Sequence, residues 1–534
     1  MSSKFLLRSA LVGAFVCITS STALAASSIV VNDPGDAETN DGVCNLREAI
    51  IAANNHAAYD GCTVTGSGSP TTIAFNLTGA GVHEIDIGAR LPAITVPVVL
   101  DGLTQPGADC TTWPPTLLVQ ITSPSNGAYN GLTLDTGSDT SIVRGLVING
   151  FNNNSGYAFN FNAAINIHAS NGNHIECNFL GTDADGTTLH ANLRGVDINS
   201  ASDNVVGSDG TPKAYFARNL ISGNQYGGVD TRGTALSGNR ISGNYIGTDV
   251  TGTVAMGGQG SAIGVSIGSN PGPATGNFIG WDGIGDPERM RNVISGFTGV
   301  AFGAITMEVG AHANRIMGNY IGTDASGMNP LPNWAGIELG SNNSVYENIV
   351  GWDGVVDAAK ARNVISGNSF VGVDINAANG TRDNAIIGNY IGMNAKGTIA
   401  LPNGSYGISL DYATANTLVA RNWIVQGAAI RFFAAGSLSG GSTASFINNA
   451  GGTHANLPAL DSSDNCVLGA VQVVAQGANV PNPNAFVNNW WGVPTGPNTA
   501  GAPSSDGSIT TAPFLTEPAT IRSDVIFRNG FDAG

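Results

Sequence analysis

Aliphatic and polar residues alternate in short runs along most of this chain, and glycine and asparagine interrupt the runs every few residues. In the recurring phrase Asn-x-Ile, the middle position varies freely between residues such as Leu220, Val293 and Arg240, while the next position stays aliphatic. A period of two places one side chain in a core and its neighbour outside, as in a β-strand. No long helical stripe occurs between residues 130 and 430, so we expect short strands there.

The runs are organised into repeats of two lengths. Asn244-Tyr-Ile-Gly-Thr-Asp249 returns at residues 319–324 and, altered at its end, at 389–394, which gives a unit of about 70 residues. The shorter phrase Gly-Val/Ile-x-aliphatic recurs about every 35 residues, with room for one further copy between Gly264 and Gly336. One winding therefore takes about 35 residues, and two kinds of winding alternate.

Phrases that recur at nearly constant spacing indicate one structural unit copied along an axis. We expect an all-β protein, a single-stranded right-handed parallel β-helix in which strands of consecutive windings pair about 4.8 Å apart. Asparagine tolerates left-handed backbone geometry at bends, and amides stacked at one corner can bond to each other along the axis. Asn45-Leu-Arg-Glu48 has the pattern of a capping box and predicts a short N-terminal helix that covers the first open strand edge.

The first residues have the pattern of a secretory signal. Lys4 and Arg8 form the basic start, Leu6 to Ile18 form the apolar centre, and Ala23-Leu24-Ala25 form the small-residue cleavage site. We therefore expect a secreted, periplasmic or cell-surface protein with no transmembrane segment. The expected organisation is a signal peptide at 1–25, an N-terminal cap and first coils at 26–130, repeats at 131–435, terminal coils and loops at 436–518, and a C-terminal tail of unknown role at 519–534.

Charge and cysteine content narrow the class of partner and the compartment. The net charge is −17, and only 11% of residues are charged. Nucleic acid is an improbable partner because binding it needs clustered basic residues, and we expect a monomer. Cys44 and Cys62 are the expected disulfide pair, closing a short loop in an oxidising compartment. The pairing of the other cysteines of the mature chain stays open: Cys110, Cys177 and Cys466.

Two segments carry a family resemblance. Val31-Asn-Asp-Pro-Gly-Asp36, followed by Cys44-Asn-Leu-Arg-Glu-Ala-Ile50, resembles the N-terminal region of bacterial secreted parallel β-helix repeat proteins of the CSLREA type. Where that family usually has serine after the cysteine, this chain has Asn45. Asn489-Trp-Trp-Gly492 is similar to the family's closing coil. The resemblance implies a β-helix and a surface or adhesin-like protein, and fold alone does not specify a reaction.

The Gly-Val-x-Ile strands predict one candidate site. If Val196 and Ile198 point inward, Asp197 points outward and stacks about 5 Å from Asp230 in the next winding, near Arg232. The expected row continues with further polar residues that could bind a ligand: Glu338, Asp374, Asn376 and Asp411.

Three interpretations of this row compete. The first is a solvated face whose polar residues only maintain solubility. The second is a Ca²⁺ site, because paired carboxylates and carbonyl groups suit a hard cation, although no cofactor is required. The third is acid/base chemistry on a glycan, in which Asp197, Asp230 and Arg232 carry out hydrolysis or elimination. Trp281, Trp352, Trp490 and Trp491 could stack on sugar rings or simply pack.

The sequence therefore favours a secreted, adhesin-like scaffold that contacts glycans or other surface ligands. The alternative is a polysaccharide lyase or glycoside hydrolase that acts on the exposed strand face.

Overall fold

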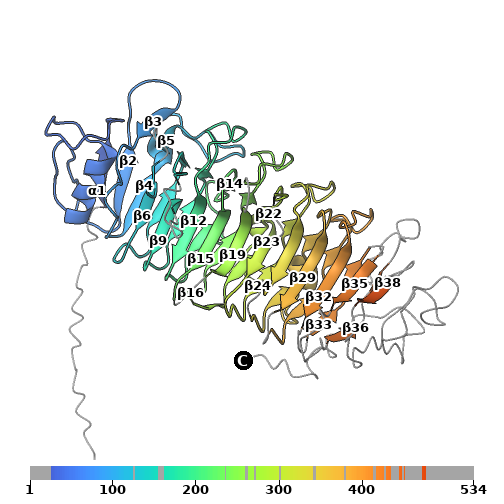
Figure 1. The fold of residues 1–534 in the computed structure, drawn as a ribbon. Helices are drawn as coiled ribbons and strands as arrows, with labels where there is room; N and C mark the ends of the chain where they lie inside the picture. The colour runs from blue at the N-terminus through green and yellow to red at the C-terminus, as the bar shows by residue number, and fades with distance from the viewer. Residues whose placement is uncertain are drawn as a thin grey trace, which may run out of the picture.

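The computed structural model shows an elongated body in which short strands stack along one axis from the N-terminal to the C-terminal end (Figure 1). It describes residues 26–425, with gaps at 124–126, 154–161, 235, 259–261, 270–271, 300–301, 341–343, 378–380 and 413–416, and four short strands beyond them. The expected signal peptide, the C-terminal tail, Cys466, Trp490 and Trp491 lie outside the described residues.

Three parallel sheets run the length of the body and form a right-handed parallel β-helix, as the repeats predict. From β6 onward, each winding contributes one strand to the third sheet, then one to the first and one to the second; the strands before β6 belong to the first and second sheets only. The 13 strands of the first sheet are β1 (Ser27–Val31), β2 (Thr71–Phe75), β4 (Val98–Asp101), β7 (Ile142–Arg144), β10 (His174–Glu176), β13 (Val205–Gly207), β17 (Arg240–Ser242), β21 (Phe278–Gly280), β24 (Arg315–Met317), β27 (Ile349–Gly351), β30 (Ala385–Ile387), β33 (Thr417–Ala420) and β36 (Ala444–Ile447). The 12 strands of the second are β3 (His83–Asp86), β5 (Val119–Thr122), β8 (Leu146–Asn149), β11 (Phe179–Leu180), β14 (Leu220–Ile221), β18 (Tyr245–Ile246), β22 (Val293–Ile294), β25 (Tyr320–Ile321), β28 (Val364–Ile365), β31 (Tyr390–Ile391), β34 (Trp423–Ile424) and β37 (Ala450–Gly451).

The third sheet has 11 strands, and it carries the candidate site. They are β6 (Leu132–Leu134), β9 (Ala163–His168), β12 (Arg194–Asn199), β15 (Gly227–Arg232), β19 (Ile263–Ser269), β23 (Gly303–Met307), β26 (Ala335–Leu339), β29 (Val371–Ala377), β32 (Tyr406–Tyr412), β35 (Ala428–Phe433) and β38 (Gln472–Gln476). The strand β23 is the further copy that the gap between Gly264 and Gly336 predicts. A separate pair, β16 (Leu236–Ser237) and β20 (Ala274–Thr275), lies at a bend.

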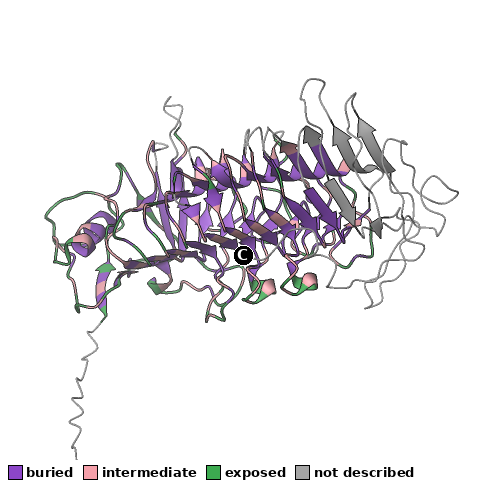
Figure 2. Cartoon of the chain, turned by 90° about the horizontal axis from the view of Figure 1, so that it is seen from below, coloured by how far each residue is buried: buried purple, intermediate pink, exposed green. Residues whose placement is uncertain are grey.

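The core is a continuous cluster of mainly aliphatic side chains inside the windings. Figure 2 shows that most strand residues along the body are buried. Val196 pairs with Val229 and Val229 with Val265, and all three are almost completely buried. Ile294 is likewise fully buried. Burial of each such side chain contributes roughly 1.5–3 kcal/mol, so a few in every winding hold the stack together.

Asparagine ladders line the bends and confirm the expected stacking of amides. In one ladder the Nδ2 of Asn319 donates to Oδ1 of Asn363 at 3.0 Å, and Asn363 donates in the same way to Asn389 at 2.9 Å. A second ladder runs from Asn173 through Asn204 at 2.9 Å and onward by the same contact. Fully buried amides are satisfied in this way at each turn of the helix.

The N-terminal end is covered by helix α1 (Leu46–Asn55), as the capping-box pattern predicts. The Asn45 side chain accepts from the Glu48 backbone, and the Glu48 side chain accepts from the Asn45 backbone. Beside the start of the helix, Cys44 and Cys62 form the predicted disulfide, with 4.6 Å between their Cα atoms. Within the described part of the chain, every helix is too short or too polar to cross a bilayer.

A second disulfide joins Cys110 to Cys177 across 67 residues, and the sequence does not predict this pairing. The segment between the short 3-10 helix η1 (Gly102–Thr104) and β5, residues 105–118, forms a strap over the second sheet. Trp113 in the strap packs edge-on against Tyr245, at 5.6 Å between ring centroids, and donates from Nε1 to the Val250 carbonyl at 2.7 Å. The strap therefore links the first windings to windings near the middle of the body.

Candidate functional site

The outward-pointing residues of the third sheet, here called the third-sheet face, bring the predicted residues together. In the strand register Asp197 pairs with Asp230, Glu338 with Asp374, and Asn376 with Asp411. The stacking inferred from the repeats is therefore present, although the side chain of Asp411 lies outside the described residues.

The first two carboxylates of the row belong to two crossed ion pairs. Arg232 on β15 reaches back to Asp197 on β12, with Nε to Oδ1 at 2.8 Å and Nη2 to Oδ2 at 2.6 Å. Arg194 on β12 reaches forward to Asp230, with Nε to Oδ2 at 2.9 Å. Ser269 donates to the other oxygen of Asp230 at 2.7 Å. Neighbouring windings are thus joined by side chains as well as by the sheet.

Asp197 is completely buried, and Asp230 is 7% exposed, although both point away from the apolar core. Asn166 also donates to Asp197, at 2.7 Å. Burial raises the pKa of Asp197 to about 6, against the opposing effect of the Arg232 guanidinium. The interpretation of the row as a solvated face is therefore wrong for this pair.

One carboxyl group near this face with a strongly raised pKa is one that the sequence reasoning missed. Glu308 directly follows β23 and is half-buried. Burial, together with the negative charges of Asp230 and Glu338 on either side, raises its pKa to about 7. Among the described residues, none donates a hydrogen bond to its carboxyl group or forms an ion pair with it.

A sequence signal for Glu308 did exist. The gap in the Gly-Val-x-Ile series located its winding, but β23 reads Gly303-Ala-Ile-Thr-Met307 and carries Thr306 where Glu338 stands in the next winding. Glu308 lies two residues after Thr306, outside the register column that contains Asp197, Asp230 and Glu338.

Glu338 lies one winding beyond Glu308 and is 4% exposed. Its Oε2 accepts from the Gly303 backbone at 3.2 Å, and its Oε1 accepts from the Asn376 side chain at 3.4 Å. Asp374 pairs with it in register and is 7% exposed. Three carboxyl groups thus lie on consecutive windings, on β26 and β29 and at the end of β23.

Aromatic rings lie at the entry to these strands, four residues before Glu338 and Asp374. Trp334 precedes β26 and stacks on Phe370, which precedes β29, with 4.6 Å between centroids and 27° between planes. Tyr406, the first residue of β32, meets Phe370 edge-on at 6.1 Å. All three rings are half-buried, so each keeps an exposed part on the windings that carry the acidic row.

The tryptophans singled out in the sequence have another role. Trp281 and Trp352 are 3% and 7% exposed, and each donates from its indole nitrogen to a carbonyl of its own loop. They pack against the short helices α2 (Pro287–Met290) and α3 (Ala358–Ala361), which close two equivalent loops. Their role is packing.

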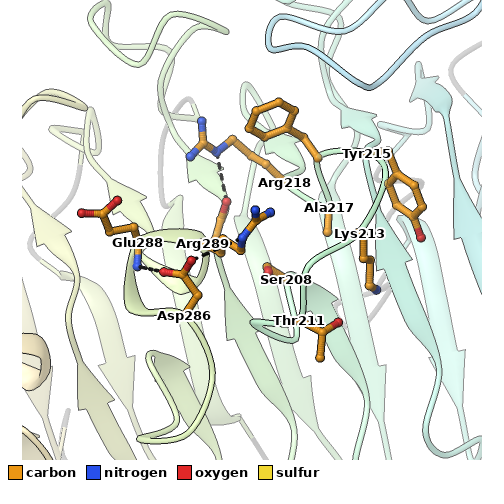
Figure 3. A pocket seen from close by; sticks show the side chains of 11 residues that line it. Ser208, Thr211, Lys213, Tyr215, Ala217, Arg218, Asp286, Glu288 and Arg289 are labelled. Carbon is orange, nitrogen blue, oxygen red and sulfur yellow. Dashed lines mark hydrogen bonds and ion pairs between the residues drawn. The ribbon is translucent and has the colours of Figure 1, made fainter.

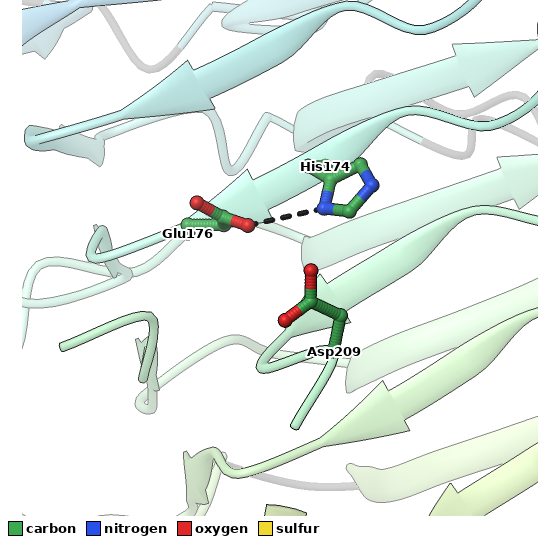
Figure 4. Close-up of side chains that lie close together, drawn as sticks. All are labelled: His174, Glu176 and Asp209. Atoms are coloured by element: carbon green, nitrogen blue, oxygen red, sulfur yellow. Dashed lines mark hydrogen bonds and ion pairs between the residues drawn. The ribbon is translucent and has the colours of Figure 1, made fainter. Parts of the chain in front are cut away.

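Among the described residues, one cluster has the composition of a metal site: His174, Glu176 and Asp209 (Figure 4). His174 Nδ1 lies 3.1 Å from Glu176. The Lys213 ammonium group, however, contacts Glu176 directly and lies 3.3 Å from Asp209. Burial raises the pKa of Glu176, but hydrogen bonds from His174, Lys213 and Tyr215 outweigh it and lower the pKa. A lysine charge therefore already occupies the place a cation would take.

The Gly-Thr-Asp turns also have satisfied carboxylates. Oδ1 of Asp249 accepts from the backbone of Thr253 and Val254, at 3.0 Å in both cases. Oδ1 of Asp324 accepts from Ser326 at 2.6 Å. These contacts are turn chemistry, so a Ca²⁺ site stays a prediction that they do not support.

A pocket of about 290 Å³ opens between the loops of two windings (Figure 3). Its lining includes Arg218, whose guanidinium lies 4.1 Å above the Tyr245 ring and donates to the Gly243 carbonyl at 3.1 Å. Arg291 and Arg362 lie in the same way over Tyr320 and Tyr390 in later windings. A contact that recurs wherever the repeat recurs is structural, so this pocket is not the candidate site.

Comparison with known proteins gives fold-level similarity. No family model and no curated protein matches the chain, so the CSLREA resemblance stays a prediction. The catalytic domain of GH87 alpha-1,3-glucanase in complex with nigerose aligns with TM-score 0.41 and 12% identity, covering 71% of this chain and 60% of that one. The Agl-KA catalytic domain aligns with TM-score 0.34 and 14% identity, covering 75% of this chain and 61% of that one.

The A-module of Azotobacter vinelandii mannuronan C-5 epimerase AlgE4 gives TM-score 0.25 and 13% identity, covering 82% of this chain and 89% of that one. This chain spans about 60% of the length of the GH87 domain. With TM-scores below 0.5, these similarities carry no argument about what this protein does.

Proposed function

We propose that this protein binds a polysaccharide along the third-sheet face and hydrolyses a glycosidic bond there, with Glu308 as the proton donor. The observation that carries the proposal is Glu308 itself, a half-buried carboxyl group whose pKa is raised to about 7 between Asp230 and Glu338. A catalytic acid works best when its pKa lies near the working pH. Glycosidases pair such an acid with a second carboxylate.

The reaction assigns roles to the neighbouring residues. Glu308 gives its proton to the glycosidic oxygen as the bond from that oxygen to the anomeric carbon breaks. A water molecule supplies the hydroxyl group to the anomeric carbon, and its remaining proton returns to the carboxyl pair. Glu338, one winding away, is our candidate for the second carboxyl group.

Asp197, Asp230 and Arg232 hold the neighbouring windings in this proposal and do not carry the chemistry. Their charged atoms already form the crossed ion pairs. A lyase would need a cation to neutralise a uronate carboxylate, and the arginines of β12 and β15, Arg194 and Arg232, are engaged with aspartates. Hydrolysis is therefore favoured over elimination.

The aromatic row supports a glycan as ligand. Trp334, Phe370 and Tyr406 lie on successive windings, and the first two stand four residues before Glu338 and Asp374, at the entry to the same strands. Rings lining a site with a few convergent polar groups are typical of small-molecule and sugar sites. We propose secretion as the setting, because two disulfides form within the chain, and such bonds persist in oxidising compartments.

The test is release of reducing ends from a panel of neutral and acidic polysaccharides. We expect Glu308→Gln to lower the rate at pH 7 by about 10²–10⁴-fold, which is the usual effect of removing a general acid. The matched control is Glu288→Gln, an exposed glutamate on α2, between the first and second sheets, which should not change the rate. Equal rates for wild type and Glu308→Gln would disprove the role of Glu308.

An adhesin-like scaffold is the second candidate. Both carboxylate oxygens of Asp197 accept hydrogen bonds from Asn166 and Arg232. These contacts join neighbouring windings and leave Asp197 no role in catalysis, which favours a scaffold. Binding of a polysaccharide without release of any reducing end from the whole panel would support the scaffold and contradict the hydrolase.

A further inference from the structure

From β12 to β29, the third-sheet face has two parts that differ in charge. On β12 and β15, the aspartates are matched by Arg194 and Arg232. The following strands contain no lysine or arginine: β19, β23, β26 and β29. They carry the carboxyl groups of Glu338 and Asp374, and Glu308 directly follows β23. This part of the face, which shares windings with the aromatic rings, therefore presents acidic and neutral side chains.

A charged ligand would disturb the carboxyl group on which the reaction depends. Asp230 and Glu338 already act on Glu308 from either side. A ligand carboxylate or sulfate would add a third negative charge, and like charges brought together at an interface repel each other and weaken binding. A ligand ammonium group would do the reverse and favour the ionised form of Glu308, which cannot donate a proton.

Resting on the proposed function, we infer that the polysaccharide bound beside Glu308 is neutral, with neither uronate, sulfate nor free amino groups on the units that contact the strands β23 to β29. Recognition then comes from hydroxyl groups bonding to the side chains of the row, and from the rings of Trp334 and Phe370. Neutral sugar rings suit such a site because they have apolar faces and hydroxyl edges.

Affinity electrophoresis on matched polymers tests this inference. The full-length protein is run through gels that contain laminarin, pullulan, dextran or hydroxyethylcellulose, through gels with the carboxymethyl derivative of each, and through gels with chitosan. We expect at least one neutral polymer to retard the protein, with at least tenfold weaker binding to its carboxymethyl derivative at low salt. Raising the ionic strength to 500 mM should narrow that difference, because salt screens the repulsion.

Substitutions locate the binding to this face. Trp334→Ala should weaken retardation by the neutral polymer several-fold, while Phe216→Ala, which removes a 39% exposed ring elsewhere, should leave it unchanged. Far-ultraviolet circular dichroism confirms that both variants are folded. Equal behaviour of the two variants would place the binding elsewhere and overturn the inference.

The outcomes separate this inference from the proposed function. Binding of a neutral polymer without cleavage upholds the substrate class and contradicts the hydrolase. Cleavage of a polyuronate, or stronger retardation by a carboxymethyl polymer or chitosan than by every neutral one, overturns the substrate class. Failure of every polymer to bind overturns it as well.

Discussion

The crossed ion pairs allow a test of how much the buried charges of the third-sheet face contribute to stability. We consider Arg232→Met, which keeps much of the side-chain length and removes the guanidinium group. Asp197 then remains fully buried without the cation that contacts both of its oxygens. Removal of one partner of a buried pair costs about 3–5 kcal/mol.

The cost depends on pH in a direction that the structure specifies. The folded-state pKa of Asp197, about 6, lies above its usual value of 3.8. Stability from this group is therefore fully present below about pH 4 and is lost as the pH rises through 6, by about 3 kcal/mol in all. Arg232 acts on the ionised form, so Arg232→Met should destabilise more at pH 8 than at pH 5.

The measurement is chemical denaturation at both pH values, with hydrogen exchange of the β12 and β15 amides, because windings of a solenoid can unfold separately. The control Lys360→Met removes a cation from a half-exposed pair with Asp357 and should cost less than about 1 kcal/mol. The double variant Asp197→Asn/Arg232→Met should be more stable than Arg232→Met alone. The reasoning is wrong if Arg232→Met lowers the free energy of unfolding no more than Lys360→Met does. It is also wrong if Arg232→Met lowers that free energy equally at pH 5 and pH 8.

Two further predictions concern the framework of the helix. Asn319→Ala removes the fully buried amide that donates to Asn363 and to the Ile279 carbonyl, and each orphaned partner costs about 1–3 kcal/mol. Its denaturation midpoint should fall clearly, whereas Asn76→Ala, at an exposed asparagine, should change it little; equal midpoints would contradict a stabilising ladder. Replacing Cys110 and Cys177 together by alanine opens a loop of 67 residues, which should cost about 4 kcal/mol by loop-closure entropy. Thermal unfolding without reductant checks this, and an unchanged melting temperature would show that the packing of the strap is sufficient.

The windings were predictable because their determinants recur in the sequence. Every winding needs an inward aliphatic pair and a bend amide, so Val196, Val229 and Val265 or Asn319 and Asn363 appear at regular steps. The gap between Gly264 and Gly336 in the Gly-Val/Ile-x-aliphatic series even predicted the position of β23 from the sequence alone. A sequence period therefore predicts only those features that all windings share.

The candidate site was only partly predictable, because it depends on what differs between windings. The stacking of Asp197 on Asp230 followed from the register, but their burial did not, since it results from Arg232 and Arg194 crossing between strands. Glu308 lies outside the repeated phrase, and its pKa depends on neighbours in two other windings. The Cys110–Cys177 bond joins a unique strap to a bend, and no repeat marks it.

The asparagine ladders have a direction. In each step the amide nitrogen of the earlier winding donates to the oxygen of the later one, as from Asn204 to Asn239 and from Asn239 to Asn277. The first amide oxygen of a ladder has no asparagine before it and needs a donor from outside the ladder. For Asn173, the backbone N–H of Ser141 donates to Oδ1 at 2.9 Å. An inserted unit therefore fits at any internal position if it brings one asparagine per corner, since it accepts from the winding before and donates to the winding after. Gene duplication can lengthen such a protein from within without leaving a buried amide unsatisfied, whereas the N-terminal end can grow only by replacing its cap.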